Sequence, residues 1–137
     1  MKGEFVTYEV AKRLKGLGFN GPCYAFYQEE YVEDIPCMVD DDDEYRATGS
    51  RTCVNSEIPK HYTGAPLYQQ GFRWIREKWG YDISIGRITK EKWKFEIDLK
   101  FVDGDDYHFI DFYFDTYEEA EEACLQKLFR VIENKGN

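Results

Sequence analysis

The amino-acid sequence predicts an α+β fold, in which a helix, a strand and an irregular loop are followed by an α-β-β-β-α unit. The three strands of that unit are expected to form an antiparallel sheet that is covered by helices on one face. The main observation is the strict alternation of polar and apolar residues over 92–101, which is the two-residue period of a strand with one buried face. The second observation is that apolar residues recur at helical spacing over 7–18, 66–79 and 116–135.

The N-terminal part is expected to begin with a helix after Thr7, whose hydroxyl can cap free N–H groups of the first turn. Gly18 suits the position after this helix, because glycine readily adopts the left-handed backbone that is common there. Residues 23–32 carry aromatic and β-branched side chains that favour a strand. Residues 33–62 are less regular, so we expect 51–54 to pair as a short strand and the rest to be loop.

The second part is expected to open with a helix over 66–78, which Gly80 ends. Strands are then predicted at 81–88, 92–101 and 107–114. An Asp-Gly pair within 102–106 favours a tight hairpin between the last two of them. The buried face of the sheet is expected to include Ile110, Phe112 and Phe114 from the third strand together with Trp93, Phe95, Ile97, Leu99 and Phe101.

The last helix carries its own start signal, because Thr116 and Glu119 have the spacing of a capping box. Glu118 and Glu119 lie in the first turn, where negative charge complements the helix dipole. The packing stripe of this helix is predicted to consist of Ala120, Cys124, Leu128, Val131 and Ile132.

Length and charge limit the classes of function. A chain of 137 residues is expected to form a single domain, 1–137, with an N-terminal part over 1–62 and the α-β-β-β-α unit over 63–137. With 27 acidic and 18 basic side chains, the net charge of −9 disfavours binding to nucleic acid phosphates or to anionic lipid. The N-terminal residues do not resemble a signal peptide and no apolar run is long enough to span a membrane, so we expect a cytoplasmic protein without a membrane partner.

No residue pattern indicates a catalytic, cofactor or metal site. The two histidines, His61 and His108, have no nucleophile near them in the sequence. The cysteines are widely spaced and no C-x₂-C pair occurs, so free thiols are expected in place of a zinc site or a disulfide framework. The four thiols belong to Cys23, Cys37, Cys53 and Cys124.

Two groups of acidic residues are the candidates for binding a partner. The longest acidic run consists of Asp40, Asp41, Asp42, Asp43 and Glu44, and it lacks the spacing of a calcium loop. Glu121 and Glu122 lie past the first turn of the last helix, where the dipole explains them less well. Both groups therefore fit a basic partner, most simply a protein.

From residue 63 onward the order of elements resembles the double-stranded RNA-binding domain. In that family the last helix opens with a Ser, two lysines, a Glu, an Ala and another lysine, and the lysines contact phosphates. Here 116–121 reads TYEEAE, so that Thr116 stands for the Ser while Glu119 and Ala120 match. The positions of the lysines hold Tyr117, Glu118 and Glu121. The resemblance implies the family's fold, and the missing lysines predict that the chain binds no duplex RNA or DNA.

The whole chain is similar to small proteins encoded by phages and prophages of gut Bacteroidetes. Three blocks carry this resemblance, EFVTYEVAKRLKGLGFNGPC at 4–23, APLYQQGFRWIREKWG at 65–80 and TYEEAEEACLQKL at 116–128. It implies a bacterial or phage cytoplasmic setting and no particular biochemical role.

Three kinds of function are compatible with these observations. The best supported is a non-catalytic interaction protein, because chemical motifs are missing while the surface is acidic and aromatic residues make up 18% of the chain. A nucleic-acid binder is the first alternative, since Arg73, Arg76 and Lys78 are interleaved with Trp74 and Trp79. The second alternative is a small hydrolase or ligand-binding domain with its site in the loop over 33–62.

Overall fold

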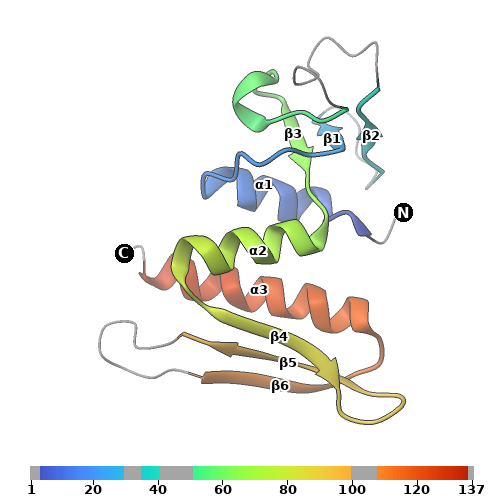
Figure 1. The fold of residues 1–137 in the computed structure, drawn as a ribbon, viewed down its shortest axis with the longest axis vertical. Helices are drawn as coiled ribbons and strands as arrows, with labels where there is room; N and C mark the ends of the chain where they lie inside the picture. The colour runs from blue at the N-terminus through green and yellow to red at the C-terminus, as the bar shows by residue number, and fades with distance from the viewer. Residues whose placement is uncertain (1–3, 30–34, 41–50, 100–107, 136–137) are drawn as a thin grey trace. The chain divides into compact units, whose positions relative to one another are not determined.

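The computed structural model describes residues 4–29, 35–40, 51–99 and 108–135. It confirms the predicted fold class, α+β, with three α-helices and two three-stranded antiparallel sheets in these ranges (Figure 1). The chain divides into two compact units, Met1–Gly71 and Phe72–Asn137, each with its own sheet. No helix within the described ranges is long and apolar enough to cross a membrane.

The sheet of unit 1 has the strand order β2-β1-β3, and α1 lies against β3. Its elements are α1 (Tyr8–Gly16), β1 (Ala25–Gln28), β2 (Cys37–Met38), the short 3₁₀ helix η2 (Asn55–Glu57) and β3 (Tyr62–Ala65). The expected strand over 23–32 is present as β1, but β3 forms at the end of the predicted loop and just before the predicted helix, where no strand was expected. Gly64 and Ala65 are weak strand formers, so tertiary pairing with β1 decides the conformation of β3.

The boundaries of α1 follow the predicted caps. The N–H of Val10 donates to the Thr7 hydroxyl at 3.3 Å. Gly18 follows the helix with φ +103°, a backbone conformation that favours glycine. The predicted N-cap and the predicted terminating glycine are therefore both confirmed.

Pairing of the 51–54 segment is confirmed at one position, an isolated antiparallel bridge between Cys23 and Cys53. Each of these residues donates its N–H to the carbonyl of the other, at 2.8 and 2.9 Å. Gly64 packs directly against this bridge, because a Cβ atom at Gly64 would lie 3.0 Å from the Cys23 sulfur. Asn55 accepts the Gly64 N–H at 2.8 Å and donates to the Phe19 carbonyl at 2.9 Å, which ties the segment to the N-terminal helix region.

Unit 2 contains a sheet with the strand order β4-β5-β6, and α3 packs along one face of it (Figure 1). Its elements are the later turns of α2 (Tyr68–Trp79), β4 (Asp82–Arg87), β5 (Trp93–Asp98), β6 (His108–Phe114) and α3 (Tyr117–Lys135). Gly80 has φ +73° and ends α2 as expected. The Arg76 guanidinium of α2 donates to the Ile83 carbonyl at 3.0 Å, which fastens the end of the helix to β4.

The core of unit 2 lies between α3 and the sheet. Phe95, Ile97 and Leu99 are buried, as the alternation over 92–101 predicted. The predicted stripe of α3 is buried in full, and Leu125 and Phe129 extend it. Phe101 and the predicted turn at 102–106 lie outside the described residues.

The expectation for β6 was wrong in part, because Ile110 and Phe112 are 41% and 45% exposed. The pairing register sets Phe109 opposite Ile97, and it then shifts so that Phe114 lies opposite Trp93. Between Phe95 and Trp93 the strand β6 therefore contains one extra residue, a β-bulge, at which Tyr113 has φ +70°. Phe109 before the bulge and Phe114 after it occupy the inner face, and Ile110 and Phe112 do not.

The four thiols are expected to differ sharply in reactivity. Cys37 is exposed, whereas the other three cysteines are buried. Burial also raises the pKa of Cys23 and Cys124, so little reactive thiolate forms at those positions. A time course with a chromogenic disulfide reagent should show one fast thiol in the folded protein and four after denaturation. Loss of the fast phase in Cys37→Ser would assign it, and several fast thiols in the unmodified chain would contradict the burial.

Candidate interaction surface

Strand β6 carries exposed apolar side chains at one edge of the unit 2 sheet. It is an edge strand, since β5 is its sole strand neighbour among the described residues. Its exposed apolar side chains are Ile110, Phe112 and Tyr113, and Tyr113 is 74% exposed. An edge strand also presents backbone N–H and C=O groups on the side away from the sheet. Exposed apolar side chains and backbone groups without a second strand partner among the described residues thus occur on the same strand.

A groove of about 540 Å³ runs beside β6, between this strand and α3. Apolar side chains, Phe95 and Phe109, form part of its lining. Its charged lining comes from Asp111 on β6 and from Lys127 and Arg130 on α3. The two cations stand three residues apart on one helix and so share a face. The groove therefore combines an apolar wall with charges of both signs.

The Lys127 ammonium lies over the Phe109 ring, 4.4 Å from its centroid. Arg130 is exposed. No described residue forms an ion pair with Lys127 or Arg130, although the protein as a whole is acidic. The carboxylate of Asp111 accepts the N–H of Phe112 at 2.9 Å, a local bond that leaves its second oxygen able to accept further hydrogen bonds.

A second hollow, of about 360 Å³, is lined by polar groups that include Asp82, Glu96, Asp98 and His108. Glu96 accepts a hydrogen bond from Lys94 at 2.6 Å, and this bond lowers the pKa of the Glu96 carboxyl. His108 lies 3.6 Å from the other oxygen of Glu96. Among the described residues, no group of three or more His, Cys, Asp or Glu side chains is placed to hold a metal ion.

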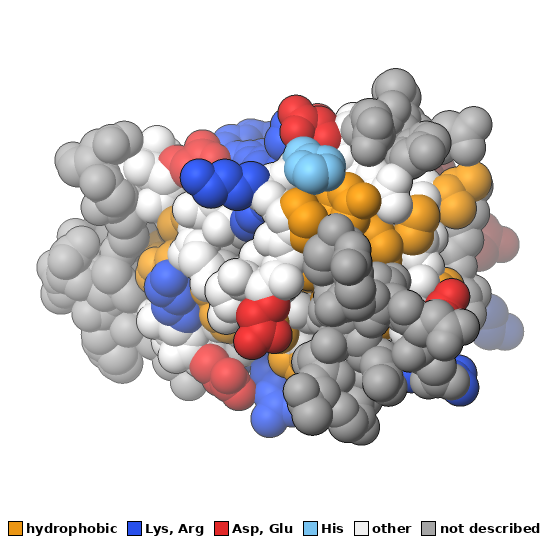
Figure 2. Space-filling view, turned by 90° about the horizontal axis from the view of Figure 1, so that it is seen from above, with side chains coloured by type: hydrophobic (Ala, Val, Ile, Leu, Met, Phe, Trp, Pro, Cys, Tyr) orange, Lys and Arg blue, Asp and Glu red, His pale blue; other side chains and the backbone are white. Residues whose placement is uncertain are grey.

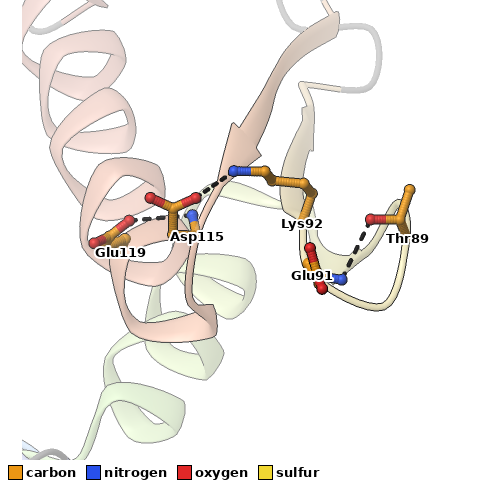
Figure 3. Close-up of polar contacts among 5 residues, drawn as sticks. All are labelled: Thr89, Glu91, Lys92, Asp115 and Glu119. Carbon is orange, nitrogen blue, oxygen red and sulfur yellow. Dashed lines mark hydrogen bonds and ion pairs between the residues drawn. The ribbon is translucent and has the colours of Figure 1, made fainter.

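The hairpin between β4 and β5 is tied to the start of α3 (Figure 3). Lys92 forms an ion pair with Asp115, which raises the pKa of the Lys92 ammonium. Glu119 accepts the N–H of Asp115 at 3.2 Å, and the Thr116 hydroxyl accepts the N–H of Glu119 at 3.1 Å. The capping interaction of Thr116 is confirmed, but Glu119 reaches back to Asp115 in place of the expected N-cap residue.

The structure corrects the expectation for Glu121. This side chain is 4% exposed, so its carboxyl is not presented to a partner. Burial raises the pKa of Glu121 to about 7, and the Tyr117 hydroxyl hydrogen-bonds to it. Glu122 is half-buried and accepts a hydrogen bond from Gln126 at 3.0 Å. In the acidic run Asp40 is exposed, and residues 41–44 lie outside the described residues.

Arg73 and Lys78 of α2 each contact other side chains of the same helix. Arg73 pairs with Glu77 at 3.1 Å, on the exposed surface. The Lys78 ammonium lies 5.0 Å from the ring centroids of both Trp74 and Trp79. Figure 2 shows acidic and basic side chains interspersed on the face that it draws, around an area where hydrophobic side chains gather beside a histidine.

Sequence reasoning missed the groove beside β6. One signal was present, because apolar residues in HFIDFYF occupy both phases of the two-residue period, and a half-buried strand cannot hide both. The spacing of Lys127 and Arg130 on α3 was a second signal. Lys127 and Arg130 come close to β6 because of the way α3 packs on the sheet. No local sequence pattern predicts that packing.

Comparisons with protein-family models, with curated proteins and with solved structures found no match to this chain. The assignment of a role therefore rests on the surface itself.

Proposed function

We propose that this chain is a non-catalytic protein-binding domain that receives an extended segment of its partner along β6. The observation that carries the proposal is the edge strand with three exposed apolar side chains, Ile110, Phe112 and Tyr113. Exposed apolar side chains that lie together commonly mark protein-binding sites. In strand addition the main chain supplies hydrogen bonds, and alternate side chains supply specificity. The edge of β6 and the groove beside it offer both kinds of contact.

Binding of duplex nucleic acid is the less favoured role. The positions of the phosphate-binding lysines hold Tyr117, Glu118 and Glu121, and Lys92 is paired with Asp115. A net charge of −9 adds long-range repulsion. The proposed domain therefore binds protein and not duplex RNA or DNA.

The proposal can be tested with a photo-crosslinking amino acid placed at Tyr113. Crosslinking in cells that express the protein should give discrete protein adducts, because the side chain at this position would lie within the bound interface. The matched control is the same substitution at Tyr24, an exposed tyrosine of unit 1, which should not give these adducts. Adding Ile110→Lys to the Tyr113 variant should remove them.

Two results would contradict the proposal. One is that Tyr113 gives no adduct beyond those of the Tyr24 control. The other is tight binding of the purified protein to duplex RNA at about 0.15 M salt. At this ionic strength surface charges are screened, so no such complex is expected.

A further inference from the structure

We propose that the strand bound at β6 is β6 of a second copy of this chain, so that two copies join their sheets edge to edge about a two-fold axis. This inference rests on the proposed function, because it names the occupant of the same surface. It goes beyond that proposal in predicting which residues of the two copies meet.

The residues that line the groove indicate which kind of strand would bind there. An incoming strand should be extended and rich in apolar side chains, to cover Phe109 and Ile110. It should also carry a carboxylate, because Lys127 and Arg130 have no ion-pair partner among the described residues. Strand β6 itself meets both requirements, since HFIDFYF places Asp111 among aromatic and aliphatic residues. The surface is therefore complementary to itself, as a two-fold interface must be.

The charges of Asp111 and Lys127 favour one register for the antiparallel pairing of β6 with β6 of the second copy. If Ile110 lies opposite Ile110 of the second copy, Asp111 of each copy comes opposite Phe109 of the other. The Lys127 ammonium already lies over Phe109, 4.4 Å from the ring centroid, so Asp111 of one copy would meet Lys127 of the other. This contact occurs twice, once on each side of the axis.

The neighbouring symmetric registers are unfavourable. A register that sets Asp111 opposite itself brings two carboxylates together, and one that sets Phe109 opposite itself brings the two Lys127 ammonium groups together. A shift by a single residue would place inner-face side chains of one copy opposite outer-face side chains of the other. The pairing about Ile110 is thus the one that satisfies both the charges and the faces of the sheet.

The first measurement is the mass of the purified full-length protein in solution, by light scattering and sedimentation velocity at micromolar concentrations. The expected result is a concentration-dependent species of twice the chain mass of 16.3 kDa. Asp111→Lys and Lys127→Asp should each weaken this dimer by roughly tenfold or more, because each creates two like-charge contacts. Glu118→Lys makes the same kind of charge change on an exposed α3 residue that does not line the groove, and it should leave the dimer unchanged.

The decisive experiment mixes the two weakened variants. In a pair of one Asp111→Lys chain and one Lys127→Asp chain, the two introduced side chains, of opposite charge, would face each other at one contact. The original Asp111 and Lys127 side chains would face each other at the second contact. The mixture should therefore associate more tightly than either variant does alone. Recovery in the mixture also shows that both variants are folded.

A monomer at every concentration would overturn the inference, as would failure of the mixture to associate or a dimer indifferent to both substitutions. If the protein is monomeric but the Tyr113 crosslinker captures a different protein, the second copy is excluded while the proposed function stands. If it is monomeric and Tyr113 captures nothing, both proposals fail.

Discussion

Phe95→Ala is expected to lower the free energy of unfolding of unit 2 by about 3–5 kcal/mol, the usual cost of truncating a buried phenylalanine. Phe95 is 3% exposed and lies at the centre of β5, on the face that α3 covers. Its ring stacks with Phe114 at a centroid distance of 5.8 Å, and Phe114 holds the end of β6 beyond the bulge. Alanine would leave a cavity that neighbouring strands cannot close without moving.

The measurement is chemical denaturation followed by tryptophan fluorescence, which reports on Trp93 beside Phe95 on the same strand. Ile88→Ala is the matched control, because Ile88 is an apolar residue of the β4–β5 connection that is 39% exposed. It should change the stability by no more than about 0.5 kcal/mol. A loss below about 1 kcal/mol for Phe95→Ala would mean that β5 turns its other face to α3.

The elements that could be predicted are those in which one local pattern dominates. Strand β5 has one apolar phase, and the stripe of α3 repeats at helical spacing, so burial follows directly from residue order. Thr7, Gly18 and Gly80 mark helix ends through local backbone chemistry, and the structure places them where they were expected. In each case the residues that decide the structure lie within a few positions of one another.

The features that escaped prediction depend on distant partners. In β6 both phases are apolar, so the buried phase is decided by register against β5 and by the bulge at Tyr113. In β3 the backbone conformation is decided by pairing with β1, because Gly64 and Ala65 have little preference for a strand. The groove beside β6 requires both that register and the packing of α3, which explains why sequence patterns alone did not reveal it.

Glu121 was predicted to be available to a basic partner because it lies past the first turn of the helix, yet its helical position indicates otherwise. It lies three residues before Cys124 and four before Leu125, both of which are buried. It therefore belongs to the edge of the packing stripe. The charge of Glu121 favours the surface, whereas its helical spacing favours the core. In the structure Glu121 is buried, so the helical spacing decides its position.

Glu121→Gln is expected to stabilise unit 2 by about 1–3 kcal/mol at pH 8, after allowance for solvent screening, and to have little effect near pH 5. Burial raises the pKa of the Glu121 carboxyl from the ordinary 4.5 to about 7 in the folded protein. Between these values the folded state binds more protons than the unfolded state, so stability falls as pH rises and levels off above about pH 7. Glutamine keeps an oxygen that accepts from Tyr117 and removes the cost of a buried charge.

The pH dependence of the free energy of unfolding, measured from pH 5 to pH 8 in the unmodified protein and the variant, tests this expectation. The groups facing Glu121 are Tyr117, Glu118 and Glu122 on α3, with Arg76 of α2 and Cys124 nearby. Burial keeps Cys124 neutral in this range, so Glu121 is the group of this cluster whose titration is expected to set the slope. Glu133→Gln removes an exposed charge on the same helix that is not among these groups, and it should leave the slope unchanged. Equal slopes for Glu121→Gln and the unmodified chain would show that the carboxyl is solvated, and a variant less stable at pH 8 would show that its ionised form is stabilised by the fold.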